Sequence, residues 1–282
     1  MTNSKKCPAC GGEALSDGKA NRNYCRVCGL AWLEDKFFGA PVYEPGRRKD
    51  IYADGKLALF GRCLALLAAR FPARGRLLDI GAASGVFLGL AKADGWTAEG
   101  VEIDPGLAAE AAAKGFKVYT RPLEELELPA GSYDAVTVFE VLSLMADPFK
   151  ALSEIGRTLK PGGSVYIREF NGAFHMALEG RRIFNFLGIQ PSVVHNFNFT
   201  AESLRRMLAA AGFKRVKIKN SPPTGGDPYG TGGRLGAALT GLLKILYYRA
   251  AQAVYYASFG IFFAGSSFII EAEKWPSEAR RA

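Results

Sequence analysis

The sequence predicts an α/β fold in which seven strands form a mostly parallel, doubly wound sheet, preceded by a small cysteine-bearing ribbon. From residue 76 onward, short apolar segments alternate with segments of helical spacing. Such alternation favours a parallel sheet with helices on both faces. Two Cys-x-x-Cys pairs precede it, within the first 28 residues. The length of 282 residues, 49% hydrophobic and 22% charged, allows a large core and excludes a disordered or fibrous chain.

An apolar helical stretch that ends at Pro72 leads into the first strand. The predicted strands are short and rich in β-branched or aromatic residues. They cover residues 76–80, 97–103, 116–120, 132–139, 163–170, 213–219 and 266–274. The segments between them have helical spacing with Gly or Pro stops, and residues 200–212 form a helix before the sixth strand.

These elements divide the chain into three parts. We expect a ribbon over residues 1–35, a linker with the lead-in helix over 36–75, and an α/β domain over 76–275. An apolar insertion at 231–263 separates the last two strands of the domain.

The two cysteine pairs have the spacing of a zinc ribbon. They are Cys7 with Cys10 and Cys25 with Cys28, separated by 14 residues, and a glycine follows each pair. Four thiolates complete the tetrahedron that zinc prefers and leave no open position, so we expect a structural zinc ion. Cys63 lies alone in the apolar helix and is interpreted as a core thiol.

The charge balance favours anionic partners. Lys and Arg number 36 against 27 Asp and Glu, a net charge of +9. Nucleic acid, a phospholipid surface and a phosphorylated substrate all fit this balance. The N-terminus lacks the apolar stretch of a secretory signal and the cysteines are few, so we expect a cytoplasmic protein, either free or associated with the inner face of the membrane.

An uncharged run over residues 250–270 complicates this expectation. Its 21 residues meet the length criterion for a membrane span. The final predicted strand needs the end of the run, which leaves a helix from Arg234 to about Tyr256. Three interpretations stay open for 234–263: a span, a peripheral helix in the membrane interface, or a cover over a substrate pocket or dimer contact. The oligomeric state stays open with them.

A glycine-containing turn follows the first strand and indicates a ligand site. The pattern is Asp79-x-Gly81-x-x-x-Gly85, which differs from the Gly-x-Gly-x-x-Gly of dinucleotide-binding proteins. Glycines at a strand-to-helix turn allow a ligand to approach the backbone at the carboxyl edge of the sheet. Glu102 ends the next strand, where a carboxylate can accept hydrogen bonds from both hydroxyls of a ribose.

With these motifs in place, the chain resembles the class I S-adenosylmethionine-dependent methyltransferases, in particular bacterial members with an N-terminal zinc ribbon. The similarity includes CPAC, CRVCGLAW, LLDIGAASGVFLGLAKADGW, GVEIDP, SYDAVTVFEVL, LKPGG and HNFNFTAESLRRMLAAAGF. It implies a Rossmann-like domain that binds S-adenosylmethionine.

The resemblance also implies a set of cofactor-binding residues. The loop surrounds the methionine moiety, Glu102 holds the ribose, and residues near Leu123 flank the adenine. The implied set is Asp79, Gly81, Ala82, Ala83, Ser84, Gly85, Phe87, Glu102, Ile103, Leu123 and Phe139. The chain departs from the family where Gly81-Ala82-Ala83 stands in place of Gly-Cys-Gly or Gly-x-Gly and where Ser143-Leu144 replaces Glu-His.

Two residues are candidates for catalysis. Methyl transfer needs alignment above all, and a general base only when the acceptor starts as a hydroxyl or a carbon acid. His195 stands where the family often has a histidine facing the substrate, although it could instead anchor a loop. Glu140 follows the fourth strand and would line the site. His175, Glu169 and Asn171 come next as candidates.

These observations support three hypotheses about function. The first is methyl transfer to a small molecule, a sugar or a lipid-linked glycan. The second is RNA methylation, which the ribbon and the charge suit, although the basic residues are dispersed and no base-flipping motif of the Asn-Pro-Pro-Tyr type appears. The third is a cofactor-binding scaffold without activity.

Overall fold

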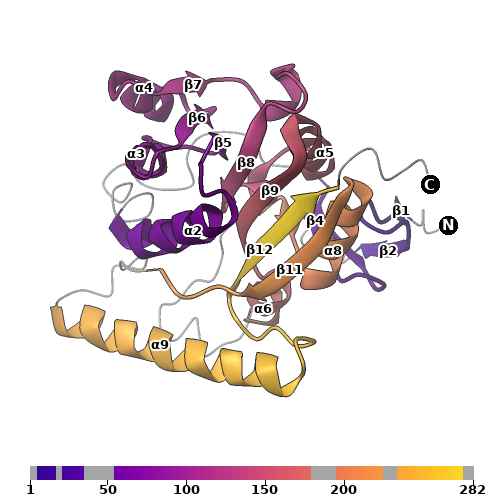
Figure 1. Ribbon diagram of the computed structural model, residues 1–282. Helices are drawn as coiled ribbons and strands as arrows, with labels where there is room; N and C mark the ends of the chain where they lie inside the picture. The colour runs from indigo at the N-terminus through magenta and orange to yellow at the C-terminus, as the bar shows by residue number, and fades with distance from the viewer. Residues whose placement is uncertain (1–4, 17–20, 35–53, 179–194, 225–233, 276–282) are drawn as a thin grey trace.

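A computed structural model describes residues 5–16, 21–34, 54–178, 195–224 and 234–275. Its centre is a seven-stranded sheet with the order β11-β12-β9-β8-β5-β6-β7 (Figure 1). All neighbouring pairs in this sheet are parallel except the two that β12 makes. The predicted fold class is therefore confirmed.

The strands of this sheet agree closely with the predicted segments. They are β5 (Arg76–Ile80), β6 (Thr97–Val101), β7 (Lys117–Tyr119), β8 (Tyr133–Phe139), β9 (Leu159–Phe170), β11 (Phe213–Asn220) and β12 (Ser267–Lys274). The strand β9 begins earlier than predicted because Leu159 pairs with Tyr133, ahead of the Lys-Pro-Gly-Gly turn.

The helices connect these strands. They are α2 (Leu57–Arg70), α3 (Val86–Ala93), α4 (Pro105–Ala113), α5 (Pro148–Thr158), α6 (Gly172–Leu178), α8 (Ala201–Ala210) and α9 (Arg234–Ala257), with short 3-10 turns η2 (Asp54–Lys56), η3 (Leu123–Glu125) and η4 (Leu142–Leu144). Both α4 and α5 begin with Asp-Pro, in which the aspartate Oδ1 accepts two backbone N–H groups and proline takes the first helical position.

The small sheet joins the N-terminal segment to the body of the protein. Its order is β1 (Lys5–Lys6), β2 (Glu13–Ser16), β3 (Arg22–Cys25), β4 (Ala31–Leu33) and β10 (Phe197–Asn198). The strand β10 comes from the second half of the chain, just after His195. One hydrophobic core contains residues of both parts, including Leu30, Phe197 and Phe199. The sequence did not predict this attachment.

The helix α9 lies along the outside of the molecule, below the layers of the main sheet in Figure 1. It follows β11, whose last residue, Asn220, donates a hydrogen bond from Nδ2 to the carbonyl of Ala251 at 3.1 Å. After α9 the chain returns as β12, as expected. No helix in the described ranges is long and apolar enough to cross a membrane. Residue 35 of the predicted ribbon, residues 36–53 of the predicted linker and residues 231–233 of the predicted insertion lie outside the described residues.

Candidate functional site

The turn after β5 has the backbone geometry expected of a ligand-binding loop. Gly81, Ala83 and Gly85 all have positive φ, at 77°, 46° and 79°. A Cβ at Gly81 would come within 2.3 Å of the Val141 side chain, so this position requires glycine for space as well as conformation. The loop then leads into α3 with its backbone bent sharply at the carboxyl edge of the sheet.

Ala83 is the strained residue of this loop, because the left-handed conformation costs free energy for an L-residue but not for glycine. The substitution Ala83→Gly is therefore expected to stabilise the protein by about 0.5–1 kcal/mol. Thermal denaturation measures the change. The adjacent Ala82→Gly is the control: Ala82 is buried and has no positive φ, so this variant should lose stability. Equal effects of the two substitutions would contradict the strain at Ala83.

Asp79 lies buried under the loop. Its Oδ1 accepts a hydrogen bond from the hydroxyl of Thr137 at 2.7 Å. Burial raises the pKa of Asp79 from 3.8 to about 7, although the bond from Thr137 and the charge of Lys56 act in the opposite direction. Burial deprives the ionised Asp79 carboxylate of hydration, so a ligand that carries an amine can bind to it.

Asp79→Asn is expected to make the free protein more stable above pH 7. Since the folded-state pKa lies above the unfolded value, the folded chain binds more protons than the unfolded chain between these values, and stability falls as the pH rises through that window. The variant removes this loss, so its advantage should be absent near pH 4 and complete above pH 7. Denaturant unfolding from pH 4 to 8 measures it, and a constant difference across that range would contradict the raised pKa.

Glu102 supports the same loop from the neighbouring strand. Its Oε2 accepts the N–H of Ala83 at 2.9 Å and its Oε1 accepts the N–H of Asp104 at 2.8 Å. Each carboxylate oxygen has a further lone pair, so the group can still accept hydrogen bonds from a ribose. Burial raises the pKa of Glu102.

The predicted apolar contacts with the cofactor occupy different environments. The rings of Phe87 and Phe139 pack edge-on at 4.9 Å and both contact Phe60, so they belong to the core beneath the loop. Leu123 is buried, whereas Ile103 is 66% exposed. The roles of these residues toward a cofactor stay predictions.

Glu140 forms ion pairs with two basic side chains, and neither ion pair was predicted from the sequence. Its Oε2 lies 2.7 Å from the Nζ of Lys56, and its Oε1 forms an ion pair with Arg168. Glu140 also has a positive φ of 60°. Lys56 lies at the start of the lead-in helix and Arg168 on β9, so no local motif connects them with Glu140. Because both oxygens of Glu140 are engaged, the geometry favours His195 over Glu140 as a base.

His195 belongs to a buried chain of hydrogen bonds. Its Nδ1 lies 2.9 Å from the hydroxyl of Ser143, and that hydroxyl donates to Oε1 of Glu169 at 3.0 Å. The N–H groups of Ser143 and Phe170 also donate to the Glu169 carboxylate. Because Ser143 gives its only proton to Glu169, its oxygen accepts from Nδ1–H, and Nε2 of His195 carries the free lone pair.

That lone pair is buried without a hydrogen-bond partner in the described structure. The His195 side chain is 6% exposed and packs against the ring of Phe170 at 4.8 Å. Burial, with a smaller contribution from His175, lowers the pKa of His195 to about 4. A neutral imidazole with an unsatisfied acceptor is an arrangement that a bound acceptor molecule would complete.

The ribbon positions the segment that follows His195. The N–H of Leu33 donates to the carbonyl of Asn196 at 2.9 Å, and Phe197 pairs with Trp32. The hydroxyl of Thr200, which caps α8, donates to the carbonyl of Cys28 at 2.5 Å. The ribbon therefore holds in place the segment that directly follows His195, the predicted catalytic histidine.

The four cysteines of the ribbon come together as predicted. The Sγ atoms of Cys7 and Cys28 lie 3.5 Å apart, as do those of Cys10 and Cys25. All four lie within 4.8 Å of one another and can hold a metal ion. Gly11 and Gly29 have positive φ at 70° and 73°, which lets the backbone turn beneath each pair. Cys63 is buried in the core, as expected.

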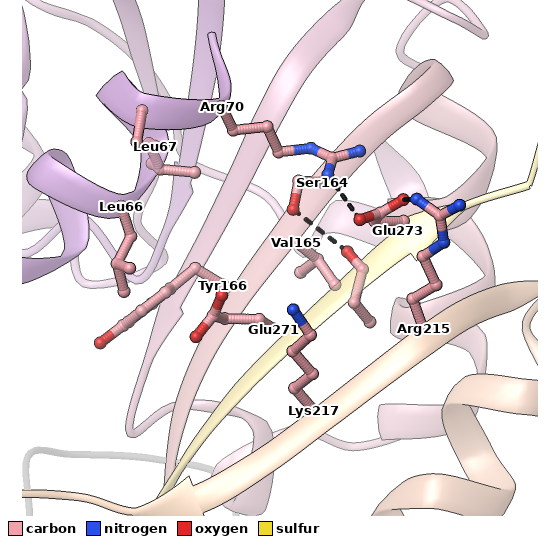
Figure 2. A pocket seen from close by; sticks show the side chains of 12 residues that line it. Leu66, Leu67, Arg70, Ser164, Val165, Tyr166, Arg215, Lys217, Glu271 and Glu273 are labelled. Carbon is pink, nitrogen blue, oxygen red and sulfur yellow. Dashed lines mark hydrogen bonds and ion pairs between the residues drawn. The ribbon is translucent and has the colours of Figure 1, made fainter.

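A separate cavity of about 310 Å³ lies on the face of the sheet beneath the end of α2 (Figure 2). It is lined by Ser164 and Tyr166 of β9, by Glu271 and Glu273 of β12, and by Arg70. These positions lie toward the edge at which the parallel strands begin, opposite the glycine loop. This cavity is therefore not part of the candidate site.

Comparison with known families agrees with the geometry of the loop. A sequence model described as a methyltransferase domain matches residues 52–218, more than half of the chain. The chain belongs to the S-adenosylmethionine-dependent methyltransferases. The predicted family and enzyme class are thereby confirmed, and the matched residues include the loop from Asp79 to Gly85, whose contact with the cofactor stays a prediction.

The curated relatives act in quinone biosynthesis, to judge by their names. A demethylmenaquinone methyltransferase of Thermus thermophilus is 32% identical over 163 residues, which cover 49% of this methyltransferase and 74% of the relative. A ubiquinone/menaquinone biosynthesis C-methyltransferase of Idiomarina loihiensis is 34% identical, covering 36% of this chain and 47% of its own length.

Solved structures share the fold. An S-adenosylmethionine-dependent methyltransferase of Archaeoglobus fulgidus has a TM-score of 0.54 and 22% identity, covering 83% of this methyltransferase and all of the archaeal chain. A phosphoethanolamine N-methyltransferase of Haemonchus contortus has a TM-score of 0.52 and 18% identity, covering 82% of this methyltransferase and 58% of its own chain. At these identities the structures support the fold alone.

Proposed function

We propose that the methyltransferase transfers a methyl group to a small-molecule acceptor, including a sugar or a lipid-linked glycan, whose accepting group starts as a hydroxyl or an acidic carbon. The observation that carries this proposal is the buried Nε2 of His195, which has no hydrogen-bond partner in the described structure, while Nδ1 lies 2.9 Å from the hydroxyl of Ser143. An amine that is already unprotonated needs no such base, whereas a hydroxyl or a carbon acid does.

The proposed reaction is an in-line displacement. The bond between the methyl carbon and the sulfonium sulfur of S-adenosylmethionine breaks, and a bond from the acceptor oxygen or carbon to that methyl carbon forms. The acceptor proton passes to Nε2 of His195. The imidazolium that results is stabilised through Ser143 by the Glu169 carboxylate, as the orienting acid of a catalytic triad stabilises its histidine.

The names of the relatives support an acceptor of low molecular weight. The Idiomarina protein is named as a C-methyltransferase, and its reaction therefore forms a bond to carbon. We propose the broader small-molecule class for this chain because Leu144 stands where many members of the family have a histidine.

We also infer that the four cysteines bind zinc with a structural role. A tetrahedral zinc site with Zn–S distances of about 2.3 Å requires neighbouring sulfurs about 3.8 Å apart. Two of the sulfur separations are 3.5 Å and all of them are within 4.8 Å, which is close to that requirement. With four cysteine ligands, the ion would have no open position for substrate.

Transfer of label from S-adenosylmethionine carrying a labelled methyl group tests the acceptor class. The protein is incubated with fractionated lysate, and label is followed into small polar products, lipids and RNA. Label in the small-molecule or lipid fraction, lost in His195→Gln, is the expected result. Label chiefly in RNA, or none from protein that binds S-adenosylhomocysteine, would overturn the proposal.

A further inference from the structure

The outward side of α9 and the turn that follows it form an exposed apolar surface, which we call the α9 face. Along the helix, Leu243, Leu246 and Val254 are 57%, 56% and 45% exposed. Beyond it, Phe259 and Phe262 are 94% and 66% exposed. The opposite side of the helix faces the body, where Ala251 is 2% exposed and the hydroxyl of Tyr255 donates to the carbonyl of Ile218 at 3.2 Å. A continuous apolar surface of this kind marks an interaction site.

Among the described residues, the charged side chains of α9 and of the cleft beside it are all basic. Between Arg234 and Ile270 the sequence contains no Asp or Glu. Arg249 is exposed on this face, and together with Arg62 of α2 it lines a cleft of about 440 Å³. The described lining of this cleft includes two tyrosines, Tyr248 and Tyr256, and no carboxylate.

We propose that the α9 face docks on a bilayer that contains anionic phospholipid, with the leucines and phenylalanines entering the acyl boundary and Arg249 and Arg62 facing lipid phosphates. Basic and aromatic residues that border an apolar helix surface are the composition of interfacial helices. A second copy of the chain fits less well, since a two-fold contact would bring Arg249 toward its equivalent, and the described residues of the face include no carboxylate to pair with either.

The position of α9 gives this docking a direction. The helix is tied to the end of β11 through Asn220 and packs on α6, where the rings of Phe174 and Tyr247 lie 5.6 Å apart. Both contacts are at the edge where the parallel strands end, which also carries the cofactor loop. Docking would therefore turn the candidate active site toward the bilayer, whatever the acceptor proves to be.

Co-sedimentation of the full-length protein with vesicles tests the proposal. The protein should sediment with vesicles of phosphatidylcholine mixed with phosphatidylglycerol, and binding should weaken with salt and with phosphatidylcholine alone. Phe259→Ser combined with Phe262→Ser should reduce binding more than tenfold, and Arg249→Gln about fivefold, the effect of roughly one lipid-facing charge. Because all three side chains are exposed, the variants should keep wild-type melting temperatures.

Matched controls come from other surfaces of the chain. Leu15→Ser removes an apolar side chain that is 44% exposed on β2, and Lys150→Gln removes an exposed charge on α5; neither should change binding. Binding that is absent, or that the α9 variants leave intact, overturns the proposal. It is also overturned if light scattering shows a dimer that Phe259→Ser with Phe262→Ser makes monomeric while vesicles bind neither form.

Discussion

Cys25→Ser is expected to abolish metal binding and to lower kcat by about two orders of magnitude or more, although Cys25 belongs to the ribbon and not to the methyltransferase sheet. Binding of a structural zinc ion contributes on the order of 10 kcal/mol to the fold of such a small segment. Without the metal, β4 loses its place beside β10, and the chain that carries His195 loses the hydrogen bonds from Leu33 and to Cys28. Metal analysis, thermal denaturation and single-turnover kinetics measure the three consequences.

The fifth cysteine supplies the control. Cys63→Ala truncates a thiol that is fully buried in α2 and should reduce stability while leaving the metal content unchanged. If Cys25→Ser lost its metal but kept the wild-type kcat, the ribbon would not position His195.

His195→Gln is expected to reduce kcat by about 10²- to 10⁴-fold, the usual contribution of a general base. The affinity for S-adenosylhomocysteine should stay unchanged, because the described hydrogen bond of the His195 ring is to Ser143 and not to the loop between Asp79 and Gly85. Ser143→Ala should have an intermediate effect, since it removes the group that orients Nδ1 and connects it to Glu169. Isothermal titration separates cofactor binding from turnover.

The pH dependence of turnover provides a further readout for the same residue. Because burial lowers the pKa of His195 to about 4, the imidazole is already neutral at neutral pH, and activity should be lost only on acidification toward that value. His175→Gln is the matched control: the Nε2–H of His175 donates to the backbone carbonyl of Ser266 at 3.1 Å, and the substitution should leave kcat close to wild type. Unchanged turnover in His195→Gln would exclude a catalytic role for His195.

The sequence predicted those features that depend on neighbours along the chain. Strands appear wherever apolar β-branched residues recur, because each buries its side chains in the parallel sheet. The turn from Asp79 to Gly85 could be recognised because the positive φ at Gly81 and Gly85 favours glycine at both positions. The cysteine pairs could be recognised for a similar reason, since two ligands of one zinc ion can come from a single turn.

Side chains brought together from distant segments could not be predicted in this way. Lys56 and Arg168 meet Glu140 from the lead-in helix and from β9, and neither position has a motif. Ser143 appeared only as a departure from the family pattern, yet it connects His195 with Glu169. The signal that could have indicated this connection was the presence of an acid on β9, Glu169, in a chain with only two histidines, of which His195 is one.

The sequence alone determined the fold class, the glycine-containing turn after the first strand of the main sheet and the grouping of the four cysteines, because each is encoded by residue types at short spacing. The tertiary structure decided that β10 completes the ribbon sheet, that His195 is oriented through Ser143, and that the apolar side of α9 faces outward. These depend on contacts between segments far apart in the chain, since burial and hydrogen bonding act through space and leave no periodic pattern in the sequence.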